Sequence, residues 1–136
     1  MTIYNFYLFN RDGTCIFYKE WRRDKQSGMA KSEEFKLMFG MLVSLRSFSE
    51  RLSSKDGHQL VRYFKTSSYR LNYMETPTGL KMVMNTDPSA VGIPELIRSI
   101  YQVTKLLAFI SSVLSRMFTR FDLKPQEYLC VFFMNI

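Results

Sequence analysis

The chain has 136 residues, enough for one domain of ordinary size, and its 46% hydrophobic and 23% charged residues are typical of a globular protein. Its formal net charge of +7 would suit nucleic acid or an anionic membrane surface. However, the Lys and Arg residues are spread along the chain with acids between them, and no nucleic-acid-binding motif is present, so we expect no nucleic-acid partner.

Metal, cofactor and membrane sites are not indicated either. Two distant cysteines, Cys15 and Cys130, and the single His58 give no metal-ligand spacing, and we expect no metal and no cofactor. The N-terminus has no signal-peptide pattern, and the longest uncharged apolar run near the C-terminus, 106–115, is too short to cross a bilayer. These features predict a cytoplasmic protein with reduced thiols.

The first elements form a predicted β-hairpin. Residues Ile3–Phe9 are almost continuously apolar, which predicts a central strand that is covered on both faces. Asp12 and Gly13 form a strong hairpin turn, and Thr14–Trp21 is the predicted returning strand.

A basic, polar loop of sequence RRDKQSGMAK follows this hairpin. Its cations Arg22, Arg23 and Lys25 are candidate contacts for an acidic partner. The alternative is that the loop is only a solvated connection.

The next element is a long predicted helix, Ser32–Leu52. Ser32 is the expected N-cap, and Glu33 and Glu34 place negative charge at the positive end of the helix. The apolar stripe expected to face the sheet consists of Phe35, Met38, Met41, Leu42, Leu45, Phe48 and Leu52.

We expect the opposite face of this helix to carry Phe39, Gly40, Val43 and Ser47. Small residues beside apolar ones would let a neighbouring backbone approach closely, so this face is the candidate partner interface. The alternative is a helix that its own domain buries on two sides.

Three predicted strands follow, at Leu60–Thr66, Tyr69–Thr76 and Leu80–Thr86, with a turn at 77–79. A second helix is predicted from Pro94 to about Phe118. The order strand-strand-helix-strand-strand-strand-helix predicts an α+β protein with a five-stranded antiparallel sheet and helices against it.

Catalytic patterns are missing. No nucleophile–base pair can be assembled around His58, and no glycine-rich phosphate loop is present. Asn85 and Asp87 are better explained as caps of a strand end than as catalytic groups. We therefore expect no catalytic residues and a domain that acts by binding other proteins.

Three strings carry a resemblance to a known family: YLFNRDGTC (Tyr7–Cys15), KLMFGMLVSLRSF (Lys36–Phe48) and YMETPTGLKMVMNTD (Tyr73–Asp87). With Trp21 and the basic loop, they make the chain similar to the longin-like small subunits of the TRAPP (transport protein particle) tethering complex, specifically the subunit usually numbered first. The resemblance extends from Ile3 to about Tyr101. It implies a longin (profilin-like) fold with sheet order 2-1-5-4-3, one long helix after strand two and one or two C-terminal helices.

The resemblance also implies a function. Such a protein is a noncatalytic subunit of a complex that tethers vesicles between endoplasmic reticulum and Golgi and promotes nucleotide exchange on a Rab GTPase. Its partners are the other TRAPP small subunits and, through the assembled complex, the Rab protein. Its association with endoplasmic reticulum and Golgi membranes is peripheral and runs through the complex.

Two other functions are alternatives. A small adaptor chain would share the fold, but the string ETPTGLKMVMNTD argues against it. A single-strand nucleic-acid binder with aromatic platforms would belong to a different class.

The resemblance ends within the predicted second helix. After Tyr101 the chain lacks the Asn-Pro turn that precedes a third helix in the family, so residues 102–136 form a divergent segment. We expect residues 1–136 to form one longin-like domain that includes this segment.

Overall fold

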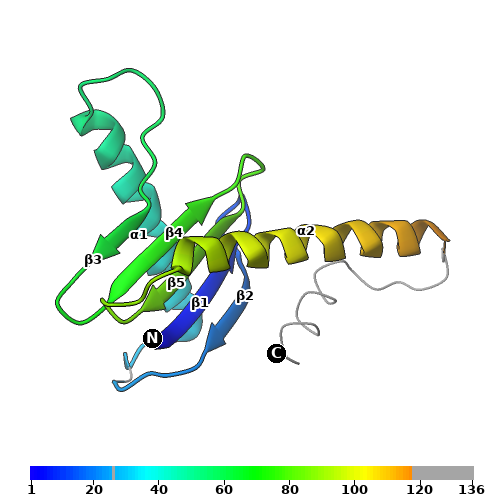
Figure 1. Cartoon of the computed structure of the whole chain (residues 1–136), viewed down its shortest axis with the longest axis horizontal. Coiled ribbons are helices and arrows are strands. Elements are labelled where there is room, and N and C mark those ends of the chain that lie inside the picture. Colours follow the sequence, from blue (N-terminus) through cyan, green and yellow to red (C-terminus); the bar gives the residue numbers. More distant parts are fainter. Residues whose placement is uncertain (26, 118–136) are drawn as a thin grey trace. The chain divides into compact units, whose positions relative to one another are not determined.

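The computed structural model describes residues 1–25 and 27–117 of the chain (Figure 1), and side chains up to residue 110. These residues belong to two units, Met1–Ile93 and a second that begins at Pro94, and each is described by itself. The elements are β1 (Ile3–Phe9), β2 (Cys15–Glu20), α1 (Lys31–Leu52), β3 (Tyr63–Lys65), β4 (Arg70–Glu75), β5 (Lys81–Thr86) and α2 (Ile93–Met117).

The five strands form one antiparallel sheet in the order β2-β1-β5-β4-β3. The sequence pattern predicted the antiparallel sheet, and the resemblance predicted the order. β1 and β5 lie in the middle. The bounds of β1 agree with the predicted strand, and its apolar run is explained because Tyr7 and Phe9 are buried on one face of the sheet and Phe6 and Leu8 on the other.

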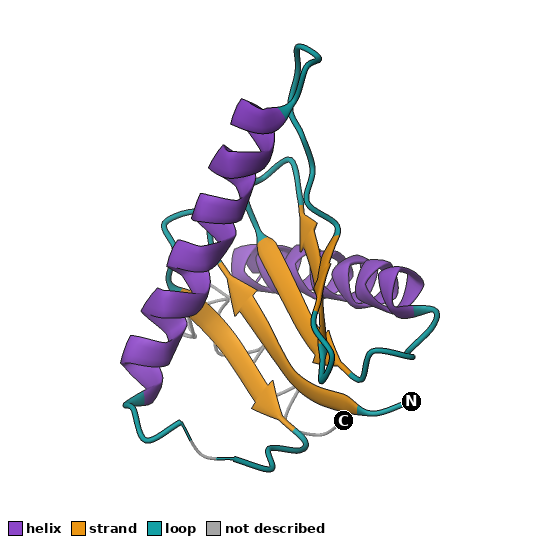
Figure 2. Cartoon of the chain, turned by 90° about the vertical axis from the view of Figure 1, so that its left-hand side faces the viewer, coloured by secondary structure: helices purple, strands orange, loops and turns teal. Residues whose placement is uncertain are grey.

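α1 crosses one face of the sheet (Figure 2). The core between them is built from Tyr7, Phe9, Leu42, Leu71 and Val83. The pairing of Tyr7 with Tyr18 and Val83, and of Val83 with Tyr73, sets three tyrosines and one valine in one row across four strands.

The predicted apolar stripe of α1 is correct only in the first half of the helix. Phe35, Met38 and Met41 pack against the core, whereas Phe48 and Leu52 are 61% and 68% exposed. The reason is geometric, since the last turns of α1 extend past the strands (Figure 2), where no sheet lies beneath them.

The turns and the short edge strand follow from local chemistry. Gly13 and Gly79 both have φ of +87° in the two predicted hairpin turns, a conformation that glycine adopts without steric cost. β3 is shorter than the predicted Leu60–Thr66, because its pairing with β4 ends with the bond from the Tyr73 N–H to the Arg62 carbonyl (2.9 Å).

The second unit contains α2, which begins at the predicted Ile93–Pro94 boundary with Glu95 in its first turn. α2 reaches Met117, the last residue described, and the predicted end at about Phe118 lies outside the described residues. The second of the one or two C-terminal helices that the resemblance implies would fall in residues 118–136, outside the described residues. The prediction of one domain over residues 1–136 stays a prediction.

No helix within the described ranges is both long enough and apolar enough to span a bilayer.

Candidate functional site

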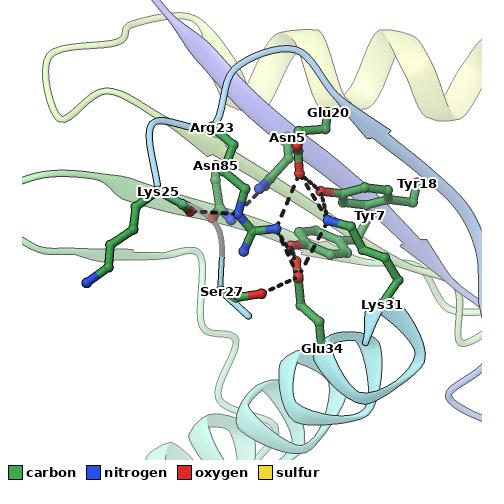
Figure 3. Close-up of polar contacts among 10 residues, drawn as sticks. All are labelled: Asn5, Tyr7, Tyr18, Glu20, Arg23, Lys25, Ser27, Lys31, Glu34 and Asn85. Atoms are coloured by element: carbon green, nitrogen blue, oxygen red, sulfur yellow. Dashed lines mark hydrogen bonds and ion pairs between the residues drawn. The ribbon is translucent and has the colours of Figure 1, made fainter. Parts of the chain in front are cut away.

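A polar cluster at the start of α1 ties the basic loop to the helix (Figure 3). Its centre is Glu34, which is only 8% exposed. The hydroxyl of Tyr7 donates to Glu34 Oε1 at 2.6 Å, and Nη1 of Arg23 donates to Glu34 Oε2 at 2.9 Å. Glu34 therefore joins three elements: strand β1, the loop after β2, and helix α1.

A second carboxylate, Glu20, extends this cluster along β2. It accepts a hydrogen bond from the hydroxyl of Tyr18 and lies 3.1 Å from Nζ of Lys31. Nη1 of Arg23 lies 3.3 Å from Glu20 Oε2, so Arg23 links the two carboxylates. Two cations and two carboxylates thus balance one another at the first turn of α1.

The ionisation of the cluster follows from its contacts. Burial alone would raise the pKa of Glu34, but the hydrogen bonds from Tyr7 and Arg23 outweigh it and lower that pKa. Burial, together with the bond to Glu34, raises the pKa of Tyr7. Near neutral pH, Glu34 is charged and Tyr7 is a neutral donor, and neither is set up as a catalytic acid or base.

The helix start corrects the predicted cap. α1 begins at Lys31 with Ala30 as N-cap, so the assignment of Ser32 to this position was wrong. The N–H groups of Glu33 and Glu34 instead donate to the Ala30 carbonyl at 3.1 and 3.0 Å. The sequence indicated Glu34 only as a charge at the helix end, and its tertiary ion pair was missed.

The three cations proposed to contact an acidic partner have different surroundings in the structure. Arg23 points into the polar cluster, where its charge is already balanced by Glu34 and Glu20. Arg22 pairs with Asp24 at 3.0 Å on the surface, and Lys25 is exposed. Contact with an acidic partner stays a prediction, for which Arg22 and Lys25 remain available.

These cations border an open groove of about 410 Å³ beside α1, which we call the loop groove. Met38 and Met41 of α1 and Leu71 of β4 supply its apolar part, and Tyr69 forms part of its wall. The other lining residues are Tyr4, Asn5, Arg22, Arg23, Asp24, Lys25, Ser68 and Asn85.

A second groove of about 390 Å³, which we call the helix groove, also borders α1. Its lining residues are Arg11, Phe39, Leu42, Val43, Arg46, Ser47, Glu50, Tyr73 and Lys81. Three members of the candidate partner interface, Phe39, Val43 and Ser47, therefore lie together.

The predicted position of Phe39, opposite the apolar stripe, was wrong. Its ring lies 5.8 Å from that of Phe9 between centroids and packs against the core. The buried face of α1 is rotated toward Phe39 relative to the predicted stripe, because Phe48 and Leu52 are exposed and do not belong to the core. Gly40 does not line the helix groove, and a Cβ atom there would meet nothing within 4 Å.

Three cations of the helix groove were missed in the sequence. Arg46 and Lys81 both contact Glu75, at 3.1 and 3.4 Å, while Arg11 lies in the β1–β2 turn. The signal that could have found Lys81 is the strand register, since Phe9 pairs with Lys81. Whether the α1 residues form a partner interface stays a prediction.

Fold and surfaces together define a class: an α+β domain in which one long helix on a sheet is flanked by two grooves. In the part of the chain that the structure describes, no group of three His, Cys, Asp or Glu side chains could hold a metal ion. The exposed apolar and basic side chains beside α1 are suited to contacts with proteins.

The chain belongs to the Sybindin-like family, whose model matches residues 3–107. It is 50% identical, over 101 residues, to trafficking protein particle complex subunit 1 of Homo sapiens, covering 74% of this chain and 70% of that protein. It is 43% identical to the subunit 1 of Dictyostelium discoideum over 101 residues, with shares of 73% and 70%. With subunit BET5 of Saccharomyces cerevisiae it shares 34% identity over 107 residues, covering 74% and 67%.

Proposed function

We propose that this chain is a noncatalytic subunit of a TRAPP-type tethering complex in transport between endoplasmic reticulum and Golgi. In this proposal it contributes surface to an assembly that promotes nucleotide exchange on a Rab GTPase. The observation that carries the proposal is the 50% identity over 101 residues with a protein named as subunit 1 of a trafficking protein particle complex.

The geometry adds support because α1 offers an exposed face for a neighbour. Gly40 is open to solvent, and Val43 is 46% exposed beside Ser47. We expect another TRAPP small subunit or the Rab protein to dock on this face. Through the complex, the chain would lie in the cytoplasm at the surface of endoplasmic reticulum and Golgi membranes.

A pull-down tests the proposal. Tagged wild-type chain in cytosol should recover the other small subunits, identified by mass spectrometry. The variant Gly40→Trp should recover at least about tenfold less of the subunit that docks on this face, because a large side chain fills the space that the neighbour needs.

The control is Lys55→Trp, which adds the same side chain in the loop after α1 and should leave recovery unchanged. Circular dichroism should show all three proteins folded, since the Gly40 site is open. If wild type recovers no TRAPP subunits, or recovers adaptor chains instead, the proposed function is wrong. If Gly40→Trp recovers as much as wild type, this face of α1 is not the interface.

The isolated chain is expected to have no exchange activity of its own. Without the other subunits it offers only part of the surface that a Rab protein would require. Release of a fluorescent nucleotide from a loaded Rab protein should stay at its intrinsic rate with a tenfold molar excess of the chain. Faster release would contradict a noncatalytic role.

A further inference from the structure

We propose that the loop groove binds an extended segment of a partner protein in which an acidic residue lies next to a leucine, methionine or aromatic residue. The inference rests on the proposed function only in that the complex would supply this segment. The groove itself is built entirely from residues of the first unit, so its binding can be measured with the isolated chain.

The apolar part of the groove suits one or two apolar side chains. Met38 and Met41 lie one turn apart on α1 and are only half-buried, although both pack against the core. Methionine side chains are flexible and polarizable, so they adapt to different apolar partners. Tyr69 adds an aromatic wall, being 36% exposed. A bound leucine or methionine would therefore remove apolar surface from water on both sides.

The rim selects for negative charge. Arg22 uses Nε in its bond to Asp24, which leaves its two terminal nitrogens without a partner among the described residues. Exposed ion pairs of this kind contribute little stability, so Arg22 can bind a second carboxylate at small cost. Lys25 makes no ion pair within the described ranges, and its side chain extends away from the polar cluster (Figure 3).

Arg23 has a different part in the groove. Its bonds to Glu34 and Glu20 tie this part of the loop to α1 and β2, and Arg22 and Lys25 lie within two residues of that anchor. Because Arg23 is tied to α1 and β2 in this way, we expect its neighbours to lose less conformational entropy on binding. Arg23 is thus a positioning residue, and the acidic ligand contacts belong to its neighbours.

One hydrogen-bond acceptor among the residues that line the groove has no donor within the described part of the chain. Nδ2 of Asn85 donates to Oδ1 of Asn5 at 2.8 Å, while Oδ1 of Asn85 is buried and accepts no bond from the described residues. Buried polar atoms normally have partners. Because this oxygen is buried in the free protein, a backbone N–H of a bound segment would reach it only if the Asn5–Asn85 pair shifted.

The groove can be tested with a phage-displayed library of random 12-residue peptides selected on the isolated chain. Wild type should enrich sequences with Asp or Glu within three residues of Leu, Met or Phe. A synthetic peptide from the enriched pool should then bind Arg22→Glu/Lys25→Glu at least about tenfold more weakly in fluorescence polarization at low salt.

Two matched controls accompany this variant. Arg51→Glu/Lys55→Glu makes the same charge change at the end of α1 and in the loop after it, and should bind like wild type. Tyr69→Ala should weaken binding, whereas Tyr63→Ala, an exposed tyrosine outside the groove, should not. Circular dichroism confirms that each variant is folded.

Several outcomes would overturn the proposal: no enrichment with wild type, enrichment without acidic residues, or equal binding by the groove variants and the controls. If the variant Arg22→Glu/Lys25→Glu binds peptides like wild type but loses binding to anionic lipid vesicles, the rim contacts a membrane surface and not a peptide. If the library yields acidic peptides but the pull-down recovers no TRAPP subunits, the groove proposal stands and the proposed complex is rejected. The two proposals can therefore fail separately.

Discussion

Replacing Glu34 by alanine is expected to lower the free energy of unfolding by about 2–4 kcal/mol. The variant leaves the Tyr7 hydroxyl and the Arg23 guanidinium without their main partner in a poorly solvated site. Removing one member of a buried pair costs more than removing both, because the remaining charge stays desolvated. Urea denaturation followed by circular dichroism measures the loss.

Glu33→Ala is the matched control, since Glu33 is the exposed neighbour in the same helical turn. Glu33→Ala should lower the free energy of unfolding by less than about 1 kcal/mol, the size of a charge effect at a helix end. If Glu34→Ala and Glu33→Ala lose the same amount, the ion pair contributes nothing beyond that charge effect.

The dependence on pH provides a second measure of the same pair. The pKa of Glu34 in the folded protein is lowered from its ordinary value of 4.5. A lowered pKa means that its stabilisation is present above pH 4.5 and is lost as the pH falls through the folded value. Wild type should therefore lose more stability than Glu34→Ala between pH 6 and pH 3. Equal losses would contradict the lowered pKa.

The second large effect is expected at Gly13, where alanine should lower the free energy of unfolding by about 2–4 kcal/mol. Two causes add. The residue has φ of +87°, which is strained for any residue with a side chain, and a Cβ atom would lie 2.6 Å from the Phe39 ring. Phe39 is held between that turn and Phe9, so the ring has to move away from its place in the core.

Gly28→Ala separates the two causes. Gly28 also has a positive φ, +71°, but a Cβ atom there would meet nothing within 4 Å. Gly28→Ala should lower the free energy of unfolding only by the cost of the strained backbone conformation, about 1–2 kcal/mol. Equal losses for both alanine variants would show that the Phe39 ring yields without cost, and that the Gly13–Phe39 contact does not fix the wall of the helix groove.

Local patterns predicted the strands well because each depends on neighbours in the chain. The continuous apolar run Ile3–Phe9 gave the bounds of β1, and the Asp12–Gly13 and Pro77–Gly79 turns gave the two hairpins. The full strand order, by contrast, came from the resemblance to a family. Nothing in the local pattern states that β5 inserts between β1 and β4.

The candidate sites were harder to predict because they depend on distant residues. Counting along α1 showed an amphipathic helix but not where the sheet ends beneath it, so Phe39 was placed on the wrong side. Arg23 looked like a surface cation because its partner Glu34 lies eleven positions later, across a loop. Charge pattern alone cannot show which cation of a cluster turns inward.

The central position of β5 also constrains when this chain can fold during synthesis. β1 is made before β5, yet β5 is one of its two neighbours in the sheet, with Ile3 paired to Thr86. Until residue 86 has left the ribosome, β1 has an apolar strand edge with no partner, and β4 has nothing to join it to the N-terminal hairpin. Such distant pairing slows folding and leaves an aggregation-prone intermediate. The nascent chain therefore exposes this edge of β1 throughout the synthesis of the segment that separates β1 from β5.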